Sequence, residues 1–253
     1  MTAPVFRITA ERDCPVGQRV ALALALRQRD SEWVTRADSG GARLNVIREG
    51  QPDLVLHDCQ AMIEFIEDLH PDRPLHPEAP ETRARHRNLM AAALRAQQRL
   101  KAVTLACDAR DYDIAIYFLR NVLQRIETGL SQETGIGQPL SNLDIVLAPL
   151  LWSILVLDRK LHTHIGVGLP HLMARGRALL RHPEISALLT DEAARRLVST
   201  LERSGSLVAA TSGPTDWRRA LGPEGHEVRL VRPRPRAAHE TPVARPAGPL
   251  RPA

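Results

Sequence analysis

The first third of the chain differs in kind from the rest, and this difference constrains the fold more than any other feature. Up to about residue 70, short runs rich in β-branched residues alternate with amphipathic segments, and from about residue 78 only long segments with helical periodicity follow. The expected strands are 5–9, 31–37, 42–47 and 53–57, and the expected helices are 15–29 and 59–69.

The order of these elements is strand–helix–strand followed by strand–strand–helix. A crossover helix between the first two strands and a hairpin before the last helix form the thioredoxin-like arrangement. We therefore predict an α/β N-terminal domain of this type, in a shortened form, over residues 1–72.

The second domain, over residues 78–205, is predicted to be all-helical. Ser141 and Asp144 form a capping-box pattern that starts a helix, because each side chain can bond the backbone amide of the other residue. The run that follows is apolar on all sides, as in the central helix of a bundle, and Pro149 within it predicts a kink. The expected helices are 78–107, 111–129, 141–158, 169–181 and 183–203.

The C-terminal tail, 206–253, is rich in Pro and Arg, and we expect it to be disordered because it has too few apolar residues to offset the entropy of ordering. It is either a basic arm that touches acidic protein, RNA or lipid, or an extension without a role. Between Thr211 and Ala253 it carries eight Arg and four acidic residues, most of the chain's net charge of +5. The nearly neutral remainder excludes direct nucleic-acid binding by the folded body.

The compartment follows from what the sequence lacks. The chain has three cysteines, Cys14, Cys59 and Cys107, and an odd, widely spaced set indicates a reducing environment. The N-terminus has no secretory pattern, and no uncharged apolar stretch is long enough to span a membrane. We expect a cytoplasmic protein that does not contact a membrane.

Cys14 is the candidate catalytic residue. It precedes Pro15, which suits a first helical turn, and the free amides and dipole at a helix start stabilise a thiolate. A dithiol mechanism needs a second cysteine three residues on, and that position is Gly17, so only monothiol chemistry is expected. Two interpretations stay open: Cys14 is a reactive thiol, or it is an inherited residue of a helix start.

Four stretches of the chain match a known pattern in their order and spacing: CPVGQRVALAL (14–24), LVLHDCQAMIEFIEDLHPDRPLHP (54–77), SNLDIVLAPLLWSI (141–154) and GLPHLMARGRALLRHPEISALLTDEAARRL (168–197). In this order they resemble the glutathione S-transferase superfamily. Within that superfamily, the run LAPLLW and the ending RHPEISALLTDEAARRL are most similar to the stringent starvation protein A group, whose members have the transferase fold but bind RNA polymerase.

The resemblance assigns a glutathione site and also shows where this chain departs from it. Asp58 and Cys59 fall at the family's acidic-Ser pair, which holds the glutamyl group, although Asp58 can equally be the cap of helix 59–69. Leu44 falls where the family has a cis-proline that binds the tripeptide backbone. Only the turn 38–41 stands where the family has a second helix that walls the pocket.

These departures favour a non-catalytic regulator of transcription and the stress response, resembling the stringent starvation protein A group. Such a protein needs no cofactor, binds a protein partner such as RNA polymerase, and by resemblance is a homodimer. The alternative is a glutathione-dependent transferase or monothiol reductase that uses Cys14, with Asp58 and Cys59 holding the glutamyl group. No metal site is expected, because His162 and His164 have no Cys or Glu ligands nearby.

Overall fold

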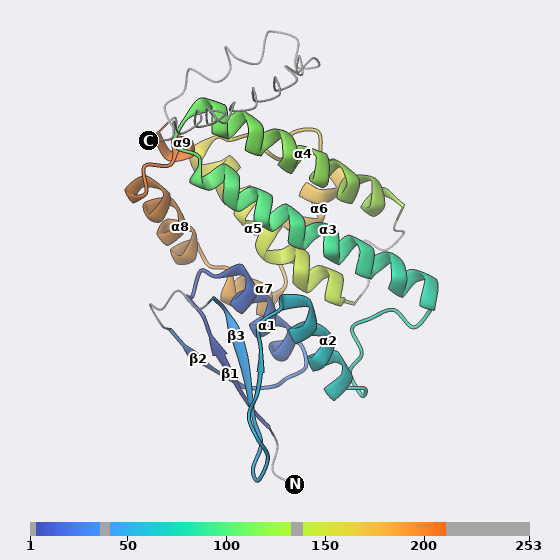
Figure 1. Ribbon diagram of the computed structural model, residues 1–253. Coiled ribbons are helices and arrows are strands. Elements are labelled where there is room, and N and C mark those ends of the chain that lie inside the picture. Colours follow the sequence, from blue (N-terminus) through green and yellow to red (C-terminus); the bar gives the residue numbers. More distant parts are fainter. Residues whose placement is uncertain (1–3, 36–40, 133–138, 211–253) are drawn as a thin grey trace, which may run out of the picture. The chain divides into compact units, whose positions relative to one another are not determined.

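The computed structural model of the protein describes residues 4–35, 41–132 and 139–210 (Figure 1). The chain divides into two compact units, and the first, Met1–Pro214, contains all of the described residues. The predicted disorder of the tail therefore falls outside the described residues, except at its start. There the short helix α9, Leu207–Ala210, lies against the end of α3, and the Leu207 amide donates to the Ala106 carbonyl over 2.8 Å.

The N-terminal part of this unit is built on a four-stranded sheet with the order β2-β1-β3-β4. β1 pairs in parallel with β2 and antiparallel with β3, and β3 pairs antiparallel with β4. This topology confirms the predicted thioredoxin-like fold class. The strands are β1 Val5–Thr9, β2 Ser31–Val34, β3 Arg43–Ile47 and β4 Leu54–Leu56, and the helices of this part are α1 Pro15–Ala25 and α2 Cys59–Leu69.

The alternation of apolar residues along the strands explains how the sheet packs. Phe6 and Ile8 of β1 and Leu44 and Val46 of β3 are almost completely buried, and they share a core with the apolar faces of α1 and α2. Because side chains alternate between the faces of a strand, these residues line one face of the sheet. α1 ends at Ala25, earlier than the predicted residue 29.

The remainder of the unit is helical, as predicted (Figure 1). The predicted helix 183–203 is wrong in one respect, because the structure breaks it into two helices at Leu189 and Thr190. The Thr190 hydroxyl accepts the Ala193 amide over 3.1 Å and so caps the second of them. The helices are α3 Pro80–Leu105, α4 Ala109–Ser131, α5 Asn142–Leu161, α6 Pro170–Leu179, α7 Pro183–Leu188 and α8 Asp191–Arg203.

Helix α5 is buried along almost its whole length, which confirms the prediction from its apolar sequence. Its capping box is present: the Asp144 carboxylate accepts the Ser141 amide over 2.9 Å, and the Ser141 hydroxyl accepts the Asp144 amide. Arg175 of α6 donates to the same carboxylate over 2.7 Å. Pro149 lies inside the helix, and the Ser153 hydroxyl donates to its carbonyl over 2.8 Å.

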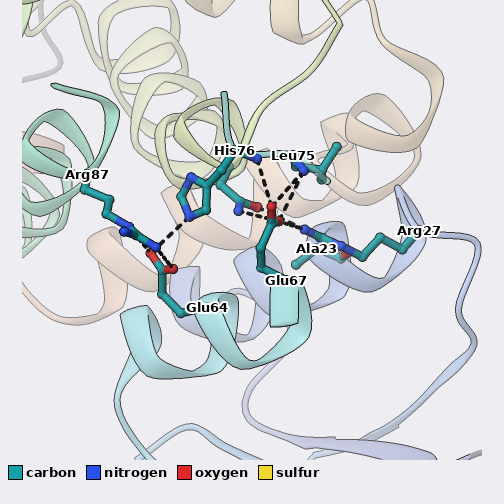
Figure 2. Close-up of polar contacts among 8 residues, drawn as sticks. Ala23, Arg27, Glu64, Glu67, Leu75, His76 and Arg87 are labelled. Atoms are coloured by element: carbon teal, nitrogen blue, oxygen red, sulfur yellow. Dashed lines mark hydrogen bonds and ion pairs between the residues drawn. The ribbon is translucent and has the colours of Figure 1, made fainter. Parts of the chain in front are cut away.

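The Glu67 carboxylate of α2 bonds to residues of three other segments of the chain (Figure 2). It accepts the backbone amides of Leu75 and His76 over 3.1 and 3.0 Å, which fixes the segment that leads into the helical part. The Asn142 side chain, at the start of α5, donates to it over 2.8 Å, and Arg27, just after α1, forms an ion pair with it. Arg27 is 2% exposed, so this ion pair is shielded from water.

A second carboxylate of α2 ties the same segment to α3. Glu64 accepts two bonds from the Arg87 guanidinium, over 2.6 and 3.1 Å, and lies 3.1 Å from Nε2 of His76 (Figure 2). The two carboxylates lie three residues apart on one face of α2. Together they hold α2, the connecting segment and the helical part in one arrangement.

Replacement of Glu67 by Gln should lower the free energy of unfolding by about 3–5 kcal/mol, because it leaves the buried charge of Arg27 without its partner. Urea unfolding followed by circular dichroism measures this loss. Glu32→Gln is the matched control, since the Arg7–Glu32 ion pair is exposed and should contribute at most about 1 kcal/mol. Equal losses of unfolding free energy in the two variants would contradict the stabilising role assigned to Glu67.

Acid should weaken the same network. Burial alone would raise the pKa of Glu67, but donors from His76 and its other neighbours and the charge of Arg27 outweigh it and lower the pKa. The stabilisation is therefore complete above the unfolded-state pKa of about 4.3 and is lost as the pH falls through the lower folded-state pKa. We expect the urea concentration at the unfolding midpoint to decrease once the pH is lowered below about 4. This decrease should be smaller in Glu67→Gln than in the wild type.

Candidate functional site

Cys14 is held at the start of α1 by a loop with several backbone bonds. The Ala10 amide donates to the Val34 carbonyl over 3.1 Å, and the Cys14 amide donates to the Glu11 carbonyl over 3.0 Å. The buried Gln18 side chain donates to the Arg12 carbonyl over 3.2 Å. Cys14 is the N-cap residue of α1, directly before the free amides of the first turn, and it is half-buried and so partly exposed to solvent.

Trp33 of β2 closes the side of this site and explains why Gly17 stands where a second cysteine of a dithiol motif would be. The Trp33 indole donates to the Ala10 carbonyl over 2.7 Å, and the Arg12 guanidinium stacks 4.9 Å from its ring centre. A Cβ atom at position 17 would lie 2.9 Å from the Trp33 ring and 3.0 Å from Cβ of Ala10. Any larger residue at this position therefore has to displace the indole.

Gly17→Val should lower the free energy of unfolding by about 1–3 kcal/mol, because the added methyl groups meet the Trp33 ring in a packed region. Ala25→Val, at an exposed position of the same helix, is the control for the smaller effect of β-branching on helix stability. In a Trp33→Leu background the cost of Gly17→Val should fall, which a double-mutant cycle in urea measures. Strict additivity would contradict the packing explanation.

The second part of the site is the N-terminus of α2. Asp58 is exposed and is the N-cap residue, with its carboxylate accepting the Ala61 amide over 2.9 Å. The predicted capping role is thus present, and its role as a ligand for glutathione stays a prediction. Cys59 is the first helical residue and is buried, with 8% of its surface exposed.

Arg19 joins these two parts and was not found from the sequence. It is 1% exposed, and its guanidinium donates to the Val146 carbonyl of α5 and to the Gln97 side chain of α3, both over 3.0 Å. Within the described ranges it forms no ion pair with a carboxylate. The signal was present in the sequence, because Arg19 is a cation on the apolar face of a helix that reads VGQRVALAL.

Arg19 and the two thiols of the site interact electrostatically. Burial lowers the pKa of Arg19, whereas attraction to Cys59 and, more weakly, to Cys14 acts in the opposite direction. Burial raises the pKa of Cys59, and charge attraction and hydrogen bonding from Arg19 offset part of that rise. The structure therefore brings Cys14 and Cys59, two of the predicted site residues, to one cation.

The third predicted position, Leu44, lies inside the sheet. It pairs with Ile8 of β1 on one side and with Leu56 of β4 on the other, and its side chain is completely buried. All peptide bonds among the described residues are trans. A contact of Leu44 with glutathione stays a prediction from resemblance, and the packing shown by the structure is that of a core residue. Most of the turn 38–41 lies outside the described residues.

Other features of the described residues add no chemistry to this site. A groove of about 1020 Å³ lies at the opposite edge of the sheet, where β1 begins and α2 ends, and its lining includes Val5 and His70 but neither cysteine of the site. No cluster of His, Cys, Asp or Glu among residues 4–35, 41–132 and 139–210 could hold a metal ion. None of the helices in those ranges is both long and apolar enough to cross a lipid bilayer.

Comparison with known proteins shows which proteins this chain is similar to. No protein-family model matches the chain. A curated relative, the probable maleylacetoacetate isomerase of Caenorhabditis elegans, is 29% identical over 157 residues, which cover 53% of this chain and 72% of that protein.

Two solved structures share the fold. The maleylacetoacetate isomerase of Anaeromyxobacter dehalogenans, with dicarboxyethyl glutathione and citrate bound in its active site, is 21% identical. The match covers 74% of this chain and 95% of that chain, with a TM-score of 0.63. Glutathione transferase Omega 1C of Trametes versicolor is 17% identical over 80% of this chain and 98% of that chain, with a TM-score of 0.65.

The chain therefore has the glutathione transferase fold that the four motifs predicted. These proteins are isomerases and transferases. The narrower prediction, a regulator of the stringent starvation protein A type, has no support from them.

Proposed function

We propose that this protein is a glutathione-dependent thiol transferase in which Cys14 is the catalytic residue. The observation that carries the proposal is the position of Cys14, a half-buried thiol at the N-cap of α1, in a fold whose solved members include an isomerase with glutathione in its active site. A thiol at a helix start is stabilised as the thiolate, which is the reactive form. The proposal adopts the alternative from the sequence and sets aside the non-catalytic function that the sequence favoured.

The residues at the start of α2 fit the glutamyl end of glutathione. Helix geometry leaves the first amides of α2, those of Cys59 and Gln60, without intrahelical partners, and such amides bind carboxylates. The exposed Asp58 carboxylate beside them suits an ammonium group. A glutamyl group carries one carboxylate and one ammonium, so Asp58 and these amides would orient the tripeptide with its sulfur toward Cys14.

In this function Cys14 supplies the nucleophile. Its thiolate attacks the disulfide of a substrate, one half of the substrate leaves as a thiolate, and the other half stays bonded to Sγ of Cys14. The thiol of glutathione loses its proton to solvent and attacks the sulfur of that bound half. A disulfide forms between glutathione and that half, and Cys14 leaves as the thiolate. Glutathione provides the reducing electrons, and the protein provides a sulfur at a helix N-terminus together with groups that suit the glutamyl group.

The names of the relatives favour a second candidate, a glutathione-dependent isomerase that acts on a substrate like maleylacetoacetate. It would use the same glutathione site and differ in the substrate that is placed beside the sulfur. Assays with a glutathionylated disulfide and with maleylacetoacetate distinguish the two candidates.

Cys14→Ser should abolish thiol transfer and leave glutathione binding largely intact, because the binding groups lie on α2. With glutathione at a hundred times its dissociation constant, both proteins should be stabilised by about 2.7 kcal/mol, which a thermal shift detects. Cys107→Ser, at an exposed cysteine after α3, is the control and should retain full activity. A wild type that shows neither a shift with glutathione nor transferase activity would refute the proposal.

Asp58→Asn should separate the two roles of Asp58. Asparagine caps helices as well as aspartate, so stability should change by only a few tenths of a kcal/mol, whereas loss of the charge should weaken glutathione binding about tenfold. Asp108→Asn, at the N-cap of α4, is the matched control, because Asp108 makes the same capping bond, over 2.9 Å, to the Asp111 amide. Unchanged glutathione affinity in Asp58→Asn would leave Asp58 with the capping role alone.

The rival function is the regulatory one, in which a homodimer binds a protein partner such as RNA polymerase. The two functions predict different binding in a lysate: a regulator co-purifies with polymerase subunits and does not bind glutathione. Retention on glutathione resin together with activity lost in Cys14→Ser excludes it, and light scattering measures whether the chain is a homodimer.

A further inference from the structure

Sheet topology brings two cysteines from different motifs to one edge of the sheet. β1 and β4 are each antiparallel to β3, so they run in the same direction. Each is followed by a helix, and the two helices contact each other. Their N-termini therefore lie at the same edge, with Cys14 at the N-cap of α1 and Cys59 at the first position of α2.

One cation lies between the two helix starts and the helical part of the protein. The guanidinium of Arg19 is buried, donates to the Val146 carbonyl and to the Gln97 side chain, and forms no ion pair with a carboxylate among the described residues. A buried cation without an anion is costly, because its solvation is lost and no opposite charge replaces it. The groups near Arg19 that can become anions are the sulfurs of Cys59 and Cys14.

We propose that Cys59 is a second redox-active thiol of this site and resolves the mixed disulfide that forms on Cys14. This inference rests on the proposed thiol-transferase function and extends it from a monothiol to a dithiol reaction. The second sulfur comes from α2, because Trp33 fills the space at Gly17, where a dithiol motif within α1 would place it. Arg19 serves as the counter-charge for whichever sulfur is ionised.

The reaction balances with oxidised glutathione as the oxidant. The Cys14 thiolate attacks the disulfide of oxidised glutathione, forms a Cys14–glutathione disulfide and releases one glutathione thiolate, which takes up a proton. The Cys59 thiol loses its proton to solvent and attacks Sγ of Cys14, which forms a Cys14–Cys59 disulfide and releases the second glutathione. Two protein thiols are oxidised, and one disulfide is reduced to two thiols. Excess reduced glutathione reverses both steps.

The test is intact-mass and peptide-mapping mass spectrometry of the full chain after exposure to oxidised glutathione. The wild type should end with a Cys14–Cys59 disulfide, seen as the loss of two hydrogens and as a cross-linked peptide pair. Cys59→Ser should stop at the first step and keep one glutathione on Cys14. Cys107→Ser is the control and should behave as the wild type does, and thermal unfolding of each variant verifies that it is folded.

Two other results overturn the inference and identify what has failed. A wild type that keeps a stable glutathione on Cys14, without the cross-link, refutes the role of Cys59 and leaves the proposed transferase function intact. If oxidised glutathione does not modify Cys14, the proposed function itself fails. In that case diamide, an oxidant that needs no binding site, tests the sulfur pair alone, and absence of the Cys14–Cys59 disulfide after diamide refutes the pairing.

Discussion

The network around the half-buried carboxylate of Glu67 is the interaction on which the arrangement of this protein depends. Its acceptor atoms receive donors from the end of α1, from the segment between the sheet and the helical part, and from the first residue of α5. These segments are far apart in sequence, and each would otherwise leave a buried polar group without a partner. The Glu67 carboxylate therefore fixes how α1, with Cys14 at its N-cap, packs on the helical part.

The chemistry of the site also depends on this junction. Arg19 of α1 reaches across to the Val146 carbonyl of α5 and to Gln97 of α3, so its position is set by the helical part. In turn, Arg19 supplies positive charge to the edge of the sheet where the thiols of Cys14 and Cys59 lie. A change in the packing of the two parts would therefore alter the electrostatics of the thiols without touching either sulfur.

The structure shows the two departures from the family pattern, at Leu44 and in the segment between β2 and β3. Leu44 fills the core as an ordinary strand residue, and only eight residues, 35–42, connect β2 to β3. From these departures the sequence favoured a protein without catalysis. The function proposed here is instead that of a glutathione-dependent enzyme, since the similar proteins are named isomerases and transferases and the start of α2 has groups that suit a glutamyl group. In the proposed glutathione site, the start of α2 is thus the part whose groups best suit the ligand.

The sequence by itself determined the order of the strands and helices, the capping box at Ser141 and Asp144, and the burial of α5, because periodicity and capping are local properties. It also placed Cys14 and Asp58 at helix starts, since both precede clear helical runs. Only the tertiary structure decided that Arg19 interacts electrostatically with both thiols and that Trp33 occupies the space that a side chain at position 17 would need. Those facts depend on contacts between segments distant in sequence, which packing sets and which no local pattern encodes.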